Sequence, residues 1–152
     1  MDRSVHARKL RLDASRRIIA ISDIHGNDAL LKRLLQKVDY QPQNDVLLLL
    51  GDLIEKGPHN LQTLQTIRQL CAQGNAHALM GNCDFVCKNI VHRYNLDFLK
   101  KVLCTRKASL LHEMAARIHQ TIDADTNMEQ LCDALMASFS DELRWADALP
   151  QI

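Results

Sequence analysis

The sequence predicts an α/β fold, in which a β-sheet flanked by helices is followed by an all-helical segment. Two observations predict it. Short apolar runs alternate with stretches of helical periodicity up to residue 84, which is the order expected of a parallel sheet with crossover helices. Beyond residue 84 the apolar residues follow helical spacing alone. We expect a single domain over residues 1–152, with a basic arm (1–16), an α/β core (17–84) and a helical segment (85–148).

The first strand is predicted at residues 18–21, where Ile-Ile-Ala-Ile is typical of a buried strand. It runs into a loop that contains Asp23, His25 and Gly26. An aspartate and a histidine two residues apart are candidate metal ligands, and the glycine permits a tight turn. Taken alone, this stretch fits equally well a polar turn in which His25 only caps the next helix.

The next helix is predicted to start at Asn27 or Asp28, and leucines and a valine recur between residues 30 and 38 at the spacing of one helix face. Turn residues at 41–44 separate it from a second apolar run, residues 46–50, which ends at Gly51-Asp52. An apolar strand that ends in a polar loop has therefore appeared twice.

A third strand repeats this arrangement. We expect a helix that begins at Pro58 and closes at Gly74, and then a short strand at residues 76–80 that ends at Gly81-Asn82-Cys83-Asp84. Parallel strands joined by right-handed crossovers bring their C-terminal ends to one edge of the sheet, where ligands usually bind. The three polar loops are therefore expected to meet.

The helical segment contains further expected helix starts. Asn95 is suited to begin one helix, residues 126–129 form a capping box for another, and Ser140 precedes a last helix. We interpret the three histidines of this segment as surface or core residues: His92, His112 and His119.

Composition excludes several classes of function. A formal net charge of +1 argues against a general nucleic-acid or membrane-surface binder. No apolar run approaches the roughly 20 residues that cross a bilayer, and the basic arm lacks the apolar segment of a signal peptide. Five cysteines, an odd number without a secretion signal, favour reduced thiols. We expect a soluble, cytoplasmic protein with no nucleic-acid or membrane partner.

The polar loop residues form a candidate metal site. The carboxylates of Asp23 and Asp52, the imidazole of His25 and the amide of Asn82 are ligand types for divalent metals, and a central carboxylate such as Asp52 can bridge two ions. One such group follows each predicted strand, which disfavours the alternative that these are only strand-ending turns. A structural zinc site at Cys83 and Cys87, four residues apart, would need a second cysteine or histidine pair at zinc-site spacing, which the sequence lacks.

Three motifs of the chain resemble those of the calcineurin-like metallophosphoesterases, and most closely the branch of serine/threonine protein phosphatases and diadenosine tetraphosphate hydrolases. The family motifs D-x-H-G, G-D-x-x-D-R-G and G-N-H-[DE] match the loops that begin at Asp23, Gly51 and Gly81. The resemblance covers about residues 17–84, and Leu149-Pro150 is similar to the Leu-Pro before the next core strand. It implies the N-terminal portion of the metallophosphoesterase sandwich, so we expect a chain truncated at its C-terminal side.

The resemblance also implies roles for individual residues. Asp23 and His25 would hold one metal ion, Asp52 would bridge two, and Asn82 would hold the second and contact substrate. Lys56 takes the place of a phosphate-binding arginine of the family. The expected catalytic residues are Asp52, Glu55 and Cys83. Glu55 replaces the family's aspartate and Cys83 its proton-donating histidine, and the two would lie against each other beside the leaving group.

The function that this resemblance implies is a metal-dependent phosphoesterase that hydrolyses phosphate esters with a metal-activated hydroxide. We expect two divalent ions, manganese first, with iron, zinc or magnesium as alternatives. The expected substrate is a phosphoprotein or a nucleotide, and a homodimer is one expected state. The family's later histidine ligands have no visible counterpart, so this chain alone is expected to be weakly active or inactive. The alternative is a non-catalytic metal- or phosphate-binding fragment, and a weaker one is a helical interaction domain on a structural base.

Overall fold

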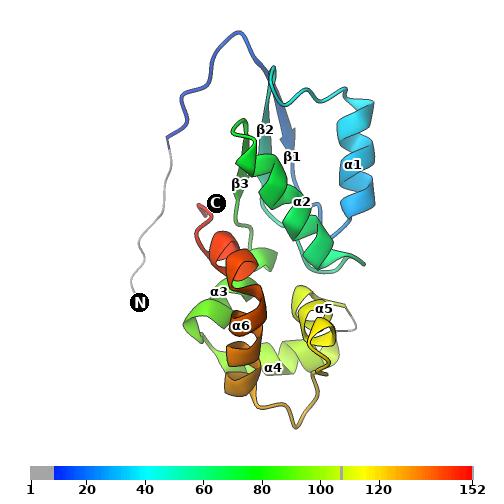
Figure 1. The fold of residues 1–152 in the computed structure, drawn as a ribbon, viewed down its shortest axis with the longest axis vertical. Helices are drawn as coiled ribbons and strands as arrows, with labels where there is room; N and C mark the ends of the chain where they lie inside the picture. Colours follow the sequence, from blue (N-terminus) through cyan, green and yellow to red (C-terminus); the bar gives the residue numbers. More distant parts are fainter. Residues whose placement is uncertain (1–8, 107, 152) are drawn as a thin grey trace.

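The computed structural model describes residues 9–106 and 108–151. Its centre is a parallel sheet of three strands in the order β1 (Arg17–Ile21), β2 (Asp45–Leu50) and β3 (Ala76–Leu79). The crossover helices α1 (Asp28–Lys37) and α2 (Asn60–Ala72) connect the strands and contact each other. Because the strands follow one another in chain order, right-handed crossovers place both helices on the same face of the sheet (Figure 1).

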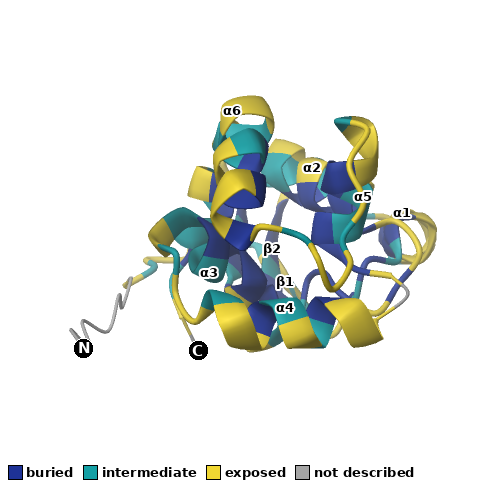
Figure 2. Ribbon diagram, turned by 90° about the horizontal axis from the view of Figure 1, so that it is seen from below, coloured by how far each residue is buried: buried dark blue, intermediate teal, exposed yellow. Residues whose placement is uncertain are grey.

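The helices that follow lie beyond the C-terminal ends of the strands (Figure 1). They are a short 3₁₀ helix η1 (Cys83–Phe85), then α3 (Val86–His92), α4 (Leu96–Thr105), α5 (Leu110–Arg117) and α6 (Met128–Asp147). In Figure 2 each of these α-helices has a buried side turned inward and an exposed side turned to solvent, the pattern of amphipathic helices around a shared core. The α/β order and the all-helical second half are therefore confirmed.

The two faces of the sheet differ in burial. Leu47 and Leu49 of β2 are fully buried under the crossover helices, and their neighbours Ala76 and Ala78 of β3 are buried with them. On the opposite face, Leu50 is 38% exposed. One face of this small sheet is thus covered while the other is partly open.

The expectation that residues 18–21 form a buried strand is wrong in part. The strand forms, but β1 is an edge of the three-stranded sheet and Ile18 is 51% exposed. Its sequence is apolar on both faces, which is typical of a central parallel strand, and periodicity cannot distinguish that case from an open edge.

Several helix boundaries differ from the sequence expectation by one or two residues. α2 begins at Asn60 and not at Pro58. α6 is capped by Asn127, whose side chain accepts a hydrogen bond from the Gln130 backbone N–H at 3.2 Å, rather than by Thr126. α6 is two helical stretches joined across a kink at the non-helical Phe139, so the expected start of a last helix near Ser140 corresponds to this kink. The start at Asn95 is confirmed.

The last described residues return to the sheet beside β3. The Met80 backbone N–H donates to the Pro150 carbonyl at 2.7 Å, and Met80 and Gln151 form an isolated parallel bridge. This segment therefore lies where the resemblance implies that a further core strand begins.

Residues 1–8 of the expected basic arm lie outside the described residues, and residues 9–16 form no helix or strand. All five cysteines are free thiols, as expected. In the part of the chain that the structure describes, no helix combines the length and the apolar character that a membrane span requires.

Candidate metal centre

The loops after β1, β2 and β3 are joined to one another by backbone hydrogen bonds. The Asp23 N–H donates to the Gly51 carbonyl at 3.3 Å, and the His25 N–H donates to the Asp52 carbonyl at 2.9 Å. The Cys83 N–H donates to the Asp52 Oδ1 atom at 3.0 Å, which joins the third loop to the second. The expected meeting of the three loops at one sheet edge is therefore observed.

Three of the predicted ligand residues have a left-handed backbone conformation. The φ angles of Asp23, His25 and Asp52 are 55°, 46° and 50°. Residues other than glycine pay roughly 1–2 kcal/mol for this conformation, and it persists where the surroundings fix it. Such outliers gather at functional sites, because strain of this kind is tolerated where side chains must be aimed at one point.

Asp84 anchors the loop that carries Asp52. Its buried carboxylate accepts hydrogen bonds from the backbone N–H groups of Leu53 at 2.9 Å, Ile54 at 3.0 Å and Gly81 at 2.8 Å. Burial raises the pKa of this carboxyl group, whereas the three backbone hydrogen bonds lower it. Sequence reasoning assigned Asp84 no role. Its place directly after a candidate ligand loop was the one available signal.

Gly81 lets the third loop approach the second. A Cβ atom at this position would overlap the backbone nitrogen and the carboxylate of Asp52. The glycine is therefore required by the close contact between these loops.

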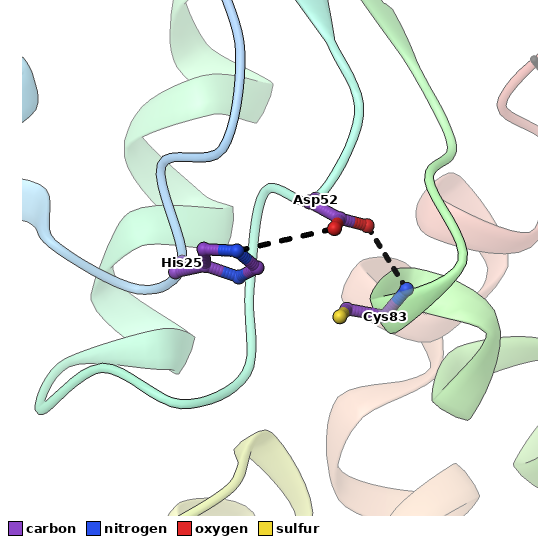
Figure 3. A group of neighbouring side chains, drawn as sticks. All are labelled: His25, Asp52 and Cys83. Carbon is purple, nitrogen blue, oxygen red and sulfur yellow. Dashed lines mark hydrogen bonds and ion pairs between the residues drawn. The ribbon is translucent and has the colours of Figure 1, made fainter.

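The ligand atoms converge from the three loops (Figure 3). The His25 Nε2 atom lies 3.6 Å from Asp23 Oδ1 and 3.9 Å from Asp52 Oδ2. His25, Asp52 and Cys83 each have one potential ligand atom within 4.8 Å of those of the other two. Two atoms bound to one ion at about 2.1 Å are separated by roughly 3–4.2 Å. The separations of His25 Nε2 from the Asp23 and Asp52 oxygens therefore suit a shared divalent cation. They are too long for direct hydrogen bonds.

The Asn82 amide lies against the Asp52 carboxylate. When its nitrogen faces Asp52, it donates hydrogen bonds at 2.9 and 3.2 Å to the two carboxylate oxygens. When its oxygen faces Asp52, two acceptors point at each other, an arrangement that a cation between them would satisfy. The predicted second ligand group is thus adjacent to the predicted bridging group.

Lys56 brings a positive charge to the same point. Its Nζ atom lies 3.5 Å from His25 Nε2, and it is also close enough to the Cys83 thiol to act on its pKa. An ammonium group beside acidic ligand atoms is in reach of an anion bound at this edge.

The thiol of Cys83 is partly buried in this cluster. Its pKa is raised, first by burial and then by the negative charge of Asp52, while Lys56 opposes the shift. The carboxylate whose charge raises the pKa of this thiol is Asp52 and not Glu55.

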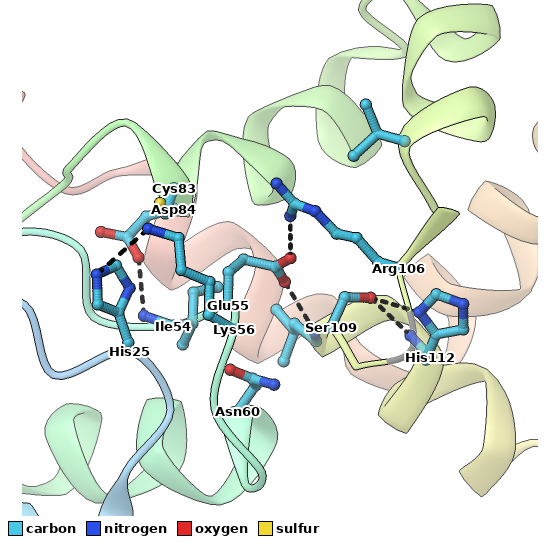
Figure 4. A network of polar contacts seen from close by, with 12 residues as sticks. His25, Ile54, Glu55, Lys56, Asn60, Cys83, Asp84, Arg106, Ser109 and His112 are labelled. Atoms are coloured by element: carbon cyan, nitrogen blue, oxygen red, sulfur yellow. Dashed lines mark hydrogen bonds and ion pairs between the residues drawn. The ribbon is translucent and has the colours of Figure 1, made fainter. Parts of the chain in front are cut away.

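The predicted pairing of Glu55 with Cys83 is wrong. The Glu55 side chain is fully buried, and its carboxylate accepts hydrogen bonds from Arg106 Nη1 at 2.6 Å and from the Leu110 N–H at 2.8 Å (Figure 4). No hydrogen bond or ion pair joins it to Cys83 within the described ranges. Burial raises the pKa of Glu55, against the lowering effects of Leu110 and Arg106. The groups that bind this carboxylate belong to the junction between α4 and α5, which the motif around Glu55 does not reveal.

The histidines of the helical segment have structural contacts. His92 Nε2 lies 2.9 Å from Asp147 Oδ1, and His112 Nδ1 lies 2.8 Å from the Ser109 hydroxyl. His119 has a left-handed backbone at the end of α5. The described residues that cluster as candidate ligands include none of these three.

An open cavity of about 410 Å³ lies over the site. It is lined by residues of all three loops and by the returning segment: Asp23, Leu50, Asp52, Met80, Gly81, Asn82, Phe85 and Gln151. The candidate ligands Asp23, Asp52 and Asn82 therefore face space that a small ligand can enter.

Comparison with known families matches residues 16–130 to the model of the calcineurin-like phosphoesterases. The chain belongs to the calcineurin-like phosphoesterase family. All candidate site residues of this chain lie within the matched range, and members of the family use divalent metal ions.

Two curated relatives each match less than half of this chain. The chain is 44% identical over 69 residues to a symmetrical bis(5'-nucleosyl)-tetraphosphatase of Paracidovorax citrulli, and 46% identical over 68 residues to one of Methylococcus capsulatus. Each match covers 44% of this chain and 23% of the relative, so the chain matches about a quarter of these proteins.

A solved structure described as a putative diadenosine tetraphosphatase has a TM-score of 0.53 and 22% sequence identity. It covers 91% of this chain, while the chain covers 45% of that structure. This likeness shows a shared fold across nearly all of this chain.

Proposed function

We propose that the chain carries the metal-dependent phosphohydrolase site of its family, with a phosphorylated nucleotide as substrate. The observation that supports it best is the convergence of Asp23, His25 and Asp52 at separations that suit a shared cation. The assignment of these residues and of Asn82 as ligands to two ions, with manganese preferred, is part of this proposal.

The residues of the chain would act on substrate as follows. Lys56 binds a phosphoryl oxygen with its ammonium group, and Asn82 orients the phosphoryl group through its amide. Cys83 lies beside Asp52, where its thiol can supply the proton that the leaving oxygen takes up when the phosphorus–oxygen bond breaks. Divalent ions, when bound, would polarise the phosphoryl oxygens and lower the pKa of the attacking water.

The nucleotide substrate is inferred from the relatives, which are named as bis(5'-nucleosyl)-tetraphosphatases. A phosphoprotein, the other substrate class expected from sequence, has no such support. The open cavity over Asp23 and Asp52 has room for a phosphoryl group and part of a nucleoside.

A direct assay tests this function. The chain with Mn²⁺ is incubated with a bis(5'-nucleosyl) tetraphosphate and, separately, with a phosphorylated peptide. We expect slow hydrolysis of the nucleotide, because the family's later histidine ligands have no counterpart in this chain. A chelator should abolish this hydrolysis, and Asp52→Asn should lack it. Binding of metal without hydrolysis of either compound would favour the non-catalytic binding fragment instead.

A further inference from the structure

Lys56 projects from a loop that is costly to form. Glu55 and Lys56 both have φ angles of 71°, so two consecutive residues other than glycine adopt the left-handed conformation. A free loop would relax from this conformation, because the Cβ atoms crowd the following carbonyls. Contacts elsewhere must therefore hold it.

One anchor lies in the helical segment. The Glu55 carboxylate points away from the metal cluster and contacts the junction between α4 and α5, where Arg106 and the first N–H of α5 donate to its two oxygens (Figure 4). The Glu55 side chain has no exposed surface, while the Arg106 side chain is 40% exposed. A guanidinium donor on one oxygen and a backbone N–H donor on the other hold this buried carboxylate in one orientation.

The other anchor lies in the first ligand loop. A Cβ atom at Gly57 would overlap the His25 carbonyl, so this loop packs directly on the backbone that carries His25. The His59 N–H also donates to the Gly26 carbonyl at 3.0 Å. Lys56 lies between the two anchors, with its ammonium 3.5 Å from His25 Nε2.

We propose that Arg106 is a positioning residue, which acts through the buried Glu55 carboxylate to hold the Lys56 ammonium at the phosphate position. The helical segment then takes part in anion binding from a distance, without contacting the anion. This inference rests on the phosphate-binding role of Lys56 in the proposed function.

A neighbouring contact of the same helix provides the matched control. Glu113 of α5 accepts hydrogen bonds from the backbone N–H groups of Asn60 at 2.8 Å and Leu61 at 2.9 Å, and so caps α2. Its Oε1 atom also accepts from the Asn60 side-chain amide at 2.8 Å, and that amide donates to the Gly57 carbonyl at 2.9 Å. Glu113→Gln keeps one side-chain oxygen for Asn60 and loses only the acceptor of the Leu61 N–H, so it should reduce the free energy of unfolding and leave anion binding intact.

The test is a double-mutant cycle on the full chain with Mn²⁺, in which calorimetry gives the affinity for inorganic phosphate. Arg106→Met should weaken phosphate binding about tenfold, Arg106→Lys should restore part of it, and Glu113→Gln should not change it. In the background of Lys56→Met, Arg106→Met should have no further effect, because its action passes through the lysine.

The outcomes separate this inference from the function on which it rests. Equal losses in Arg106→Met and Glu113→Gln, or an undiminished effect of Arg106→Met in the Lys56→Met background, would overturn the positioning role alone. Unchanged phosphate affinity in Lys56→Met would overturn the phosphate role of Lys56, and the inference with it. Because Arg106 is partly exposed, its variants should fold, and urea unfolding of each variant verifies this.

Discussion

The Nε2 atom of His25 and the Oδ2 atom of Asp52 lie 3.9 Å apart, although 26 residues and a complete crossover helix separate the two in the chain. Both residues have left-handed backbones, and a direct hydrogen bond joins the His25 N–H to the Asp52 carbonyl at 2.9 Å. The parallel sheet brings the two loops together, and the backbone contact fixes where the side chains point. The predictions below test what this arrangement does.

Asp84 should stabilise the site loops. Its two carboxylate oxygens accept hydrogen bonds from three backbone N–H groups. Asp84→Asn keeps only one of the two oxygens, so at least one N–H group in the buried loop loses its acceptor. We expect a loss of about 1–3 kcal/mol in the free energy of unfolding by urea, together with weaker metal binding. Glu129→Gln, at an exposed carboxylate on α6, is the control. Equal stability of the two variants would show that Asp84 does not anchor the loop.

Asp45 should make stability depend on pH in the acid range. Arg17 donates to its carboxylate at 3.0 and 2.7 Å and lowers its pKa below the usual 3.8, with a further contribution from the Gln41 N–H. A lowered folded-state pKa stabilises the protein above the unfolded pKa, and this stabilisation is lost as the pH falls through the folded value. Wild type should therefore exceed Asp45→Asn in stability near neutral pH, and the difference should shrink below about pH 3.8. A difference that stays constant from pH 7 to pH 2.5 would contradict this.

The open face and edge of the sheet should favour self-association. Ile18 on the edge strand is 51% exposed, and edge strands of this kind pair with other chains. We expect light scattering to show association at high concentration, which Ile18→Lys reduces because a charge on the edge strand opposes pairing. Phe98→Lys on α4, where the side chain is 60% exposed, is the control. A strict monomer at every concentration would exclude the proposed homodimer.

Cys83 should limit the turnover of substrates with poor leaving groups. A thiol with a raised pKa donates a proton less readily near neutral pH than an imidazole does. Cys83→His should raise turnover of an alkyl phosphate on the order of 10²-fold, and much less for a nitrophenyl phosphate, whose leaving group needs no proton. Cys104→His, at an exposed thiol on α4, should change neither. Equal gains on both substrates would exclude a proton donor at residue 83.

The positions of Asp23, His25, Asp52 and Asn82 could be predicted because each follows an apolar strand, and parallel strands share an edge. The role of Asp84 could not be predicted, because it depends on backbone N–H donors of another loop. The orientation of Glu55 could not be predicted either, because it depends on a helix junction 51 to 55 residues after Glu55 in the chain. The exposure of β1 could not be predicted either, because an apolar strand has the same sequence pattern at the centre and at the edge of a sheet. Local periodicity thus predicted the elements and the meeting point, while long-range polar contacts determined how the loops are held.

The most direct test of the central claim is calorimetric titration of the chain with Mn²⁺, compared between wild type, Asp52→Asn and Asp23→Asn. Asp52 contacts all three loops and is proposed to serve two ions, whereas the Asp23 side chain is 66% exposed and is proposed to serve one. The account predicts two bound ions per wild-type chain and the largest loss of affinity, more than tenfold, in Asp52→Asn. Binding by Asp52→Asn that equals wild type in affinity and stoichiometry would contradict it.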